Sequence, residues 1–480
     1  MYRVVRPLLA TLCVCFLSLA LAGCGAEYRH DVKGITLNYQ HGQYAAAADE
    51  ANAAVHDAAK KDKRDQLIFL LEAGDADRLA NRVPLSTQMF DKSYDLFSYY
   101  DQLAKTRISK EATSAFLNQA ALDYEGTGYD RIMANVYTAL NYLDQGDKDN
   151  ARIEIHRIAD SQRRNEQRWA DKLKQSEQVA KENNADVSRA EQDPKVKQGT
   201  GELLSDFNTS EDQAALQNLS PKAVYDNPYA EYLQGLFYLY STAPGDREVG
   251  RVALRNAAGM MQGNSYAVED AHLSESAANG ATLPPRTYVI FETGMAPKRV
   301  PVQIFIPVFL RNGANAIAIA FPCLKKVDLA ERYLSISAGS HTYQTRMLAD
   351  MDAIVAREFK NDLPIIITRA VISATVKAAA NYAADEATRN SNGFVRIGTE
   401  LSMLTYQAVT NEADVRTWRT LPKYVELASF PTPADGILNL SLPEGTPVPS
   451  VKVTPGKSTL VWVRCPSIMS SCVVRTFELN

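Results

Sequence analysis

Cys24 is the residue of this chain whose position most clearly allows covalent chemistry. It follows a short basic region with Arg3 and Arg6 and an apolar run over residues 7–21, an order that is typical of an export signal. The run is too short for a membrane-spanning helix, which needs about 20 apolar residues. A cut directly before Cys24 would leave a thiol and a free amine on one residue, and both groups can be acylated.

The residues at the expected cut, Leu21-Ala22-Gly23-Cys24, resemble the lipobox of bacterial lipoproteins. The resemblance implies that the preceding segment is a lipoprotein signal peptide and that Cys24 carries three acyl chains. Because each buried CH₂ contributes about 0.8 kcal/mol, three chains would anchor the protein durably. The residue after the cysteine is Gly25. An Asp at this position would retain such a protein in the inner membrane, so the implied location is the periplasmic side of the outer membrane. The alternative is an ordinary signal peptide cut beside a cysteine.

The oxidising compartment implied by export bears on the later cysteines. Cys465 and Cys472 flank six residues between strand-like runs over 459–464 and 473–479. A hairpin brings such positions together, so we expect a Cys465–Cys472 disulfide and a buried free thiol at Cys323. A bond from Cys323 to either of the other two is the alternative.

Two charged stretches in the second half of the chain could form an acid/base site. Their members are Asp350, Asp352, Arg357, Glu358 and Arg369, and then Asp414, Arg416, Trp418 and Arg419. Carboxylates beside arginines can have shifted pKa values. More often such groups form ion pairs that hold helices against a sheet, and we expect that structural role here.

Other signs of catalysis are weak. Glu292 directly follows a strand-like run, and we interpret it as a turn acceptor. His341 lies in Gly-Ser-His-Thr, where neighbouring residues rarely reach triad geometry. The sequence has no Gly-x-Ser-x-Gly, His-Glu-x-x-His, P-loop or Cys-x-x-Cys motif, and its six histidines are scattered. We therefore expect no enzyme activity, no cofactor and no metal site.

The first half of the chain is predicted to consist of helices, and these helices must help to position the residues discussed above. Residues 131–160 have apolar and small residues at helical spacing on both sides of Gly146, which predicts a helix hairpin. Ala139, Tyr142, Gly146 and Ala151 fall where a tetratricopeptide repeat has its small, aromatic, turn and small residues. Weaker units of the same kind cover residues 28–58, 66–100 and 228–262. The sequence therefore predicts an all-α, tetratricopeptide-like domain over 24–284, with an irregular helical domain as the alternative.

A charged insertion interrupts this helical domain at about residues 161–220. Its apolar residues are too few to form a core of their own. We expect a solvated helical extension over 161–185 and a mobile loop over 186–220.

Residues 285–480 change to a period of two, which is typical of strands. A long helical stretch over 348–388 should be broken or kinked by Pro364, and a short helix is expected near 398–410. Strands return at 423–429, 437–442, 450–453, 459–465 and 472–478. This order predicts an α+β domain after the helical one.

Charge and hydropathy argue against a nucleic-acid partner and against a membrane-spanning helix after the signal segment. Removal of residues 1–23 leaves 457 residues and, with Arg3 and Arg6 lost, takes the formal charge from −4 to −6. A nucleic-acid partner would require a basic face, so none is expected. We find no later stretch of about 20 uncharged apolar residues, so we expect the lipid to be the only membrane attachment.

Taken with the lipobox, the hairpin over residues 140–152 and the segments 355–359 and 363–369 resemble a family of uncharacterised proteobacterial outer-membrane lipoproteins. That resemblance implies a tetratricopeptide-like N-terminal half, an envelope location and no catalytic residues. We expect a non-enzymatic scaffold or adaptor whose concave helical surface binds unidentified protein partners of the cell envelope. The alternatives are an envelope enzyme, for example one acting on peptidoglycan with a site in 285–480, and a subunit of a secretion or assembly complex.

Overall fold

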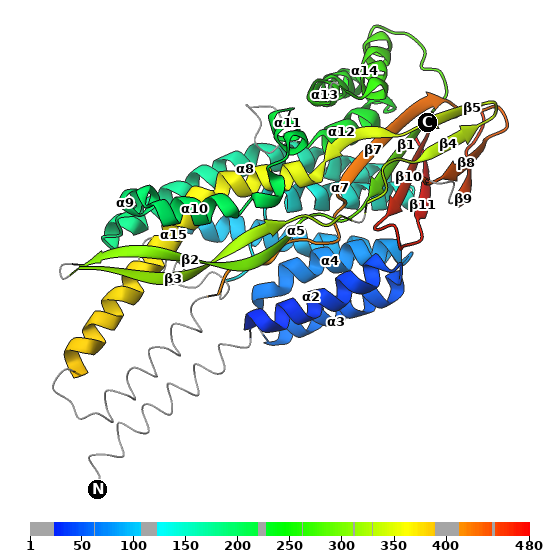
Figure 1. The fold of residues 1–480 in the computed structure, drawn as a ribbon. Coiled ribbons are helices and arrows are strands. Elements are labelled where there is room, and N and C mark those ends of the chain that lie inside the picture. The colour runs from blue at the N-terminus through cyan, green and yellow to red at the C-terminus, as the bar shows by residue number, and fades with distance from the viewer. Residues whose placement is uncertain are drawn as a thin grey trace.

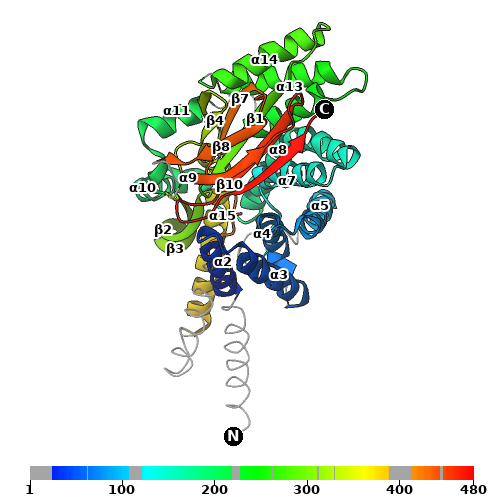
Figure 2. The same ribbon diagram turned by 90° about the vertical axis from the view of Figure 1, so that its right-hand side faces the viewer.

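The computed structural model describes residues 24–61, 63–106, 122–218, 227–261, 263–310, 313–328, 330–388, 412–443 and 447–480. The N-terminal half of the chain is helical, and the C-terminal half supplies the strands and one long helix (Figures 1 and 2). The expected signal segment 1–23 and the expected helix near 398–410 lie outside the described residues.

The four predicted hairpins are pairs of adjacent helices. They are α2 (Cys24–Gln40) with α3 (Tyr44–Lys61), α4 (Gln66–Leu79) with α5 (Val83–Thr106), α7 (Gly128–Asp144) with α8 (Lys148–Glu182), and α12 (Pro228–Leu239) with α13 (Asp246–Met260). A further helix, α14 (Ser265–Ala278), packs on α13 and was not predicted. The prediction of a helical first half is therefore confirmed.

Small residues make these hairpins possible. Gly42 and Gly146 turn the chain with φ of 72° and 75°, a conformation that other residues rarely adopt. A Cβ added at Gly235 would lie 2.6 Å from Cγ of Leu254, so α12 and α13 approach closely only because this position has no side chain.

Three sheets form from the strands of the second half. A five-stranded sheet has the order β11 (Val473–Glu478), β10 (Thr459–Cys465), β1 (Arg286–Thr293), β7 (Tyr424–Pro431), β6 (Arg346–Asp350), and only β1 and β10 pair in parallel. A four-stranded sheet has the order β5 (His341–Gln344), β4 (Ser335–Ala338), β8 (Ile437–Ser441), β9 (Pro447–Lys452). The strands β2 (Lys298–Leu310) and β3 (Gly313–Lys325) form a separate two-stranded ribbon.

The five-stranded sheet is buried on both faces. Val289 and Phe291 of β1 belong to a cluster shared with the four-stranded sheet. Tyr288 and Ile290, on the other face, belong to the cluster that contains the helical hairpins. Because that second cluster includes buried residues from both halves, the predicted division at residues 284 and 285 crosses a continuous hydrophobic core.

Of the break or kink predicted at Pro364, the break does not occur. Helix α15 (Met351–Thr388) runs through it. A proline inside a helix removes one hydrogen bond and costs about 3 kcal/mol. The flanking side chains of Phe359, Ile365 and Val371 are buried, and α15 packs on α8 and on the ribbon, so tertiary packing outweighs this cost.

The predicted mobile loop over 186–220 is also wrong where the structure describes it. These residues form α9 (Val187–Gln192), α10 (Pro194–Glu202), a 3₁₀ turn η3 (Ser205–Phe207) and α11 (Ser210–Asn218). Val196, Leu203 and Phe207 are buried, and α10 packs on β2. The segment has too few apolar residues to form a hydrophobic core alone, but together with the β2–β3 ribbon it forms one. The helical extension predicted before it is confirmed as the end of α8.

Helix α15 meets the length and composition of a membrane-spanning helix over Met351–Ala383, with mean hydropathy 1.5, and it is the one helix among the described residues to do so. Half of its most apolar window is buried inside the protein. Figures 1 and 2 both show the end of α15 extending from the body on the same side as the start of α2.

Candidate functional site

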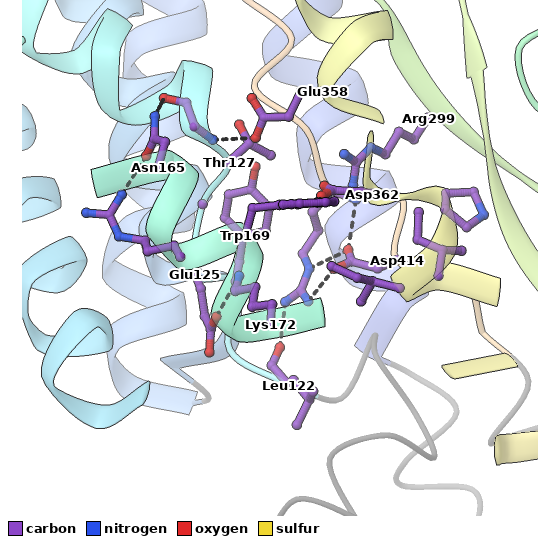
Figure 3. Close-up of a pocket in the computed structure, with 18 of the residues that line it drawn as sticks. Leu122, Glu125, Thr127, Asn165, Trp169, Lys172, Arg299, Glu358, Asp362 and Asp414 are labelled. Carbon is purple, nitrogen blue, oxygen red and sulfur yellow. Dashed lines mark hydrogen bonds and ion pairs between the residues drawn. The ribbon is translucent and has the colours of Figure 1, made fainter. Parts of the chain in front are cut away.

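A cavity of about 180 Å³ lies where the start of α7, α8, α15, the start of β2 and the segment 412–417 meet (Figure 3). Its lining is unusually rich in charge. The cations are Arg131, Arg168, Lys172, Arg299, Arg369 and Arg416, and the carboxyl groups are Asp123, Glu125, Glu358, Asp362 and Asp414. We take this cavity as the candidate functional site.

Four residues that the sequence singled out converge on this cavity. Glu358 and Arg369 come from the first charged stretch, and Asp414 and Arg416 come from the second. No local pattern indicated that the two stretches meet, since residues 369 and 414 are separated by the end of a helix and by residues outside the described part.

Glu358 holds α15 against the first turn of α7. Its oxygens accept hydrogen bonds from the backbone N–H groups of Gly128 at 2.5 Å and of Tyr129 at 3.1 Å. These donors have no partner within the helix, and the positive end of a helix favours a carboxylate. Burial and the neighbouring Asp362 nevertheless raise the pKa of Glu358 to about 8, against the opposing effect of the two N–H groups.

Arg416 is fully engaged in joining chain segments. Its guanidinium contacts Asp414 at 2.8 Å and Asp65 at 3.0 Å, and it donates to the carbonyl of Leu122 at 2.8 Å. Burial acts to raise the pKa of Asp414, but the charge of Arg416 outweighs burial and holds that pKa below its ordinary value. This pair is a structural cross-link.

The cations on α7 and α8 are paired as well. Arg168 makes two hydrogen bonds of 2.7 Å to the carboxylate of Asp101, and Arg131 lies 3.3 Å from the same carboxylate. Lys172 lies 3.0 Å from Glu125. These ion pairs fix one wall of the cavity.

Arg299 differs from Arg131, Arg168, Lys172 and Arg416, and the sequence analysis missed it. Its Nε is buried and has no hydrogen-bond partner within the described part of the chain, and its guanidinium lies over the ring of Phe359 at 5.5 Å. Burial lowers the pKa of Arg299, but Tyr129, Tyr124, Asp414 and Asp362 together raise it above its ordinary value. The only sequence signal was an arginine at the start of an otherwise apolar strand.

Other members of the two charged stretches lie elsewhere. Asp350 accepts a hydrogen bond from the backbone N–H of Ala353 and so caps α15. Asp352 pairs with Lys423 at 2.6 Å. These contacts fit the structural role that the sequence predicted.

Trp418 and Arg419 belong to a segment that fills the inner face of the helical array. Trp418 packs against Phe90 and Tyr137, with ring centroids 5.9 Å apart in both pairs. Glu72 of α4 accepts hydrogen bonds from the backbone N–H of Arg419 at 2.8 Å and from the hydroxyl of Thr420 at 2.7 Å. These contacts pack the segment against α4, α5 and α7.

Glu292 is not in a turn, as the sequence analysis expected, but within β1 and fully buried. It accepts hydrogen bonds from the hydroxyl of Tyr137 at 3.0 Å and from the indole Nε1 of Trp462 at 2.9 Å. His341 begins β5, is exposed, and lies 3.3 Å from the hydroxyl of Ser340. Glu292 therefore stabilises the core, and His341 lies outside the cavity lining.

The structure joins Cys465 and Cys472 in a disulfide with 4.4 Å between their Cα atoms. Cys323 is a buried free cysteine. The loop inside the disulfide contacts the turn between α2 and α3, because Ser467 donates to the carbonyl of Gln40 and Tyr44 donates to the carbonyl of Ser471. Cys24 is the first residue of α2.

Comparison with known proteins adds no relative: no protein-family model, no curated protein and no solved structure matches this chain. Across the described ranges, no group of three or more His, Cys, Asp or Glu side chains is placed to hold a metal ion.

Proposed function

We propose that this protein is a lipid-anchored, non-enzymatic scaffold on the periplasmic side of the outer membrane that binds protein partners of the cell envelope. We further propose that its helix hairpins are tetratricopeptide-like units, which agrees with the buried Ala139 and Ala151 at the expected small positions and with Gly146 at the turn. The partner surface in this proposal is the outer face of the β2–β3 ribbon, and not the filled inner face of the array.

The observation that carries the proposal is the exposed aromatic side chain of Phe305 on that ribbon. Ile304, Ile306 and Val308 are buried on the inner face, and a Cβ at Gly199 of α10 would lie 2.9 Å from Ile304. On the outer face Phe305 is 56 % exposed and pairs across the ribbon with Ala318. Phenylalanine is one of the aromatic residues enriched in protein interfaces.

The anchor part of the proposal is supported by the position of Cys24. The helix that begins at Cys24 is tied to the body within two turns, because Arg29 lies 3.2 Å from Glu412 and the hydroxyl of Tyr28 donates to the carbonyl of Thr417. Acyl chains on Cys24 would therefore hold the body close to the membrane, without a long linker.

Metabolic palmitate labelling tests the anchor. We expect label in the wild-type chain and none in Cys24→Ser, with Cys323→Ser as a matched cysteine control that keeps the label. Label that persists in Cys24→Ser would overturn the anchor assignment.

Photo-crosslinking in intact cells tests the partner surface. A crosslinking amino acid at Phe305 should give a discrete protein adduct. The control is Ile153 on α8, whose exposure of 48 % is similar. An adduct of equal yield at Ile153, or none at Phe305, would contradict binding at the ribbon.

A further inference from the structure

We propose that the charged cavity binds an oxyanion, a phosphate-type group, through the guanidinium of Arg299. No motif in the sequence marks this site, and the scaffold function does not require it. Four observations support it: the unused donor of Arg299, the state of the nearby carboxyl groups, the cavity walls, and the position of the cavity relative to α2.

Arg299 has hydrogen-bonding capacity that no described residue uses. Arg131, Arg168, Lys172 and Arg416 each lie within ion-pair distance of a carboxylate. The Nε of Arg299 is buried, and no described residue accepts a hydrogen bond from it. Because a buried charged donor without a partner is costly, an acceptor from outside the chain would be strongly favoured there.

The carboxyl groups nearest Arg299 offer it little competition. Asp414 already accepts hydrogen bonds from the Nε and the backbone N–H of Arg416, and both oxygens of Glu358 are taken by the start of α7. Burial raises the pKa of Asp362, although Lys172, Arg299 and Arg369 act to lower it. Figure 3 shows Arg299, Asp362 and Asp414 on the same side of the cavity, with Asn165 on the opposite side.

The cavity has the size and walls that such a ligand needs. Its volume of about 180 Å³ is well above the space of about 10–15 Å³ that one water requires. Trp169, Pro322, Ile365 and Ile366 contribute apolar surface to the lining, which strengthens a charge interaction by excluding water. A planar guanidinium matches two oxygens of a phosphate or carboxylate.

The cavity also lies beside the helix that begins at Cys24. Asp414 and Arg416 line it, and the same short segment contacts α2 through Glu412 and Thr417. Tyr28 is four residues from Cys24, about 6 Å along the helix. If Cys24 is acylated, as the proposed function requires, phosphate groups of lipids would be present near the cavity. Free phosphate offers the same chemistry.

Calorimetric titration of the purified full chain in a neutral detergent, with inorganic phosphate at constant ionic strength, tests the inference. We expect saturable binding to the wild-type chain and at least tenfold weaker binding to Arg299→Gln. Lys298→Gln is the matched control, because Lys298 is the exposed neighbour on the same strand and its loss should leave the affinity unchanged. No binding to the wild-type chain, or equal binding to Arg299→Gln, would overturn the proposal.

A second variant separates loss of binding from loss of folding. Asp362→Asn removes the negative charge that Asp362 carries whenever it is ionised, so phosphate should bind to this variant as tightly as to the wild-type chain or more tightly. A misfolded cavity cannot produce this result. Weaker binding in Asp362→Asn would contradict an oxyanion seated beside Arg299.

Short-chain phosphatidylglycerol, used as a soluble monomer, distinguishes the two sources. Tighter binding than inorganic phosphate, lost in Arg299→Gln, would identify a lipid headgroup as the occupant. Binding of inorganic phosphate alone would identify a free anion. Both results are independent of palmitate labelling, so failure of the anchor assignment would leave the oxyanion site standing.

Discussion

Two arginines, Arg464 in the core and Arg299 in the cavity, each bury an Nε without a hydrogen-bond partner among the described residues. Arg464 is fully buried, and its other nitrogen atoms donate to the carbonyls of Gly294 at 2.7 Å and Thr420 at 2.8 Å. Its Nε also lies 3.8 Å from Glu292. No comparable set of contacts surrounds Arg299. The difference separates a guanidinium that stabilises the fold from one that is available to a ligand.

Loss of Arg464 should give the largest effect. Arg464→Met leaves Glu292 without its counter-charge and two carbonyls without donors, and removing one partner of a buried pair costs about 3–5 kcal/mol. Denaturant unfolding followed by circular dichroism measures this change in the free energy of unfolding. Arg163→Met is the control, because Arg163 is 73 % exposed. A cost below 1 kcal/mol for Arg464→Met would show that the core arginine is no more structural than the surface one.

The disulfide next to Arg464 should follow in size. Opening the short loop between Cys465 and Cys472 costs about 2–3 kcal/mol by the loss of chain constraint, and it also loosens the contacts with Gln40 and Tyr44. Reduction of the wild-type chain and the double variant Cys465→Ser, Cys472→Ser should lower the thermal midpoint equally. A further drop when the double variant is treated with reductant would indicate that another bond had been broken.

The pH dependence of stability tests the role of Glu358, which lines the cavity. Its pKa is about 8 in the folded chain and about 4.5 when unfolded, so the folded state binds the proton more tightly. Stability from this group is present in full below pH 4.5 and is lost as the pH rises toward 8, with a slope of at most about 1.4 kcal/mol per pH unit. Glu358→Gln should flatten the fall in stability between pH 5 and 8. The exposed control Glu211→Gln should not, and equal slopes in all three proteins would refute the assignment.

Arg299→Gln should have the smallest effect on stability, within about 1 kcal/mol, because its Nε makes no hydrogen bond within the described part of the chain that could be lost. Thermal unfolding in a chloride buffer without phosphate measures this change in stability. A loss of stability as large as that caused by Arg464→Met would mean that Arg299 stabilises the fold and is not available to bind a ligand.

Local patterns predicted much of this structure. The glycines at 42 and 146, the small residues inside the hairpins and the period of two after residue 285 predicted the helix pairs and most strands. The Cys465–Cys472 pairing followed from hairpin geometry. In each case the determining residues are close in the sequence, so their spacing contains the information.

Long-range contacts were not predictable in this way. The carboxyl group of Glu358 caps a helix that begins 230 residues earlier in the chain, and no local pattern encodes that contact. The continuous helix through Pro364 and the short helices after residue 186 depend likewise on packing against the ribbon and neighbouring helices. The two charged stretches were visible as residue types, but their meeting with Arg299 required the tertiary structure.

The segment around Trp418 that fills the inner face of the helical array has a consequence for how the chain folds. Tyr28, Phe90 and Tyr137 of the early hairpins contact the segment near residue 418, and β1 pairs with β10 near the C-terminus. When the chain is synthesised from its N-terminus, part of this aromatic surface therefore stays exposed to solvent until the last 70 or so residues are available. Such contacts between distant positions slow folding, and truncation near the C-terminus would affect the first helices as much as the last strands.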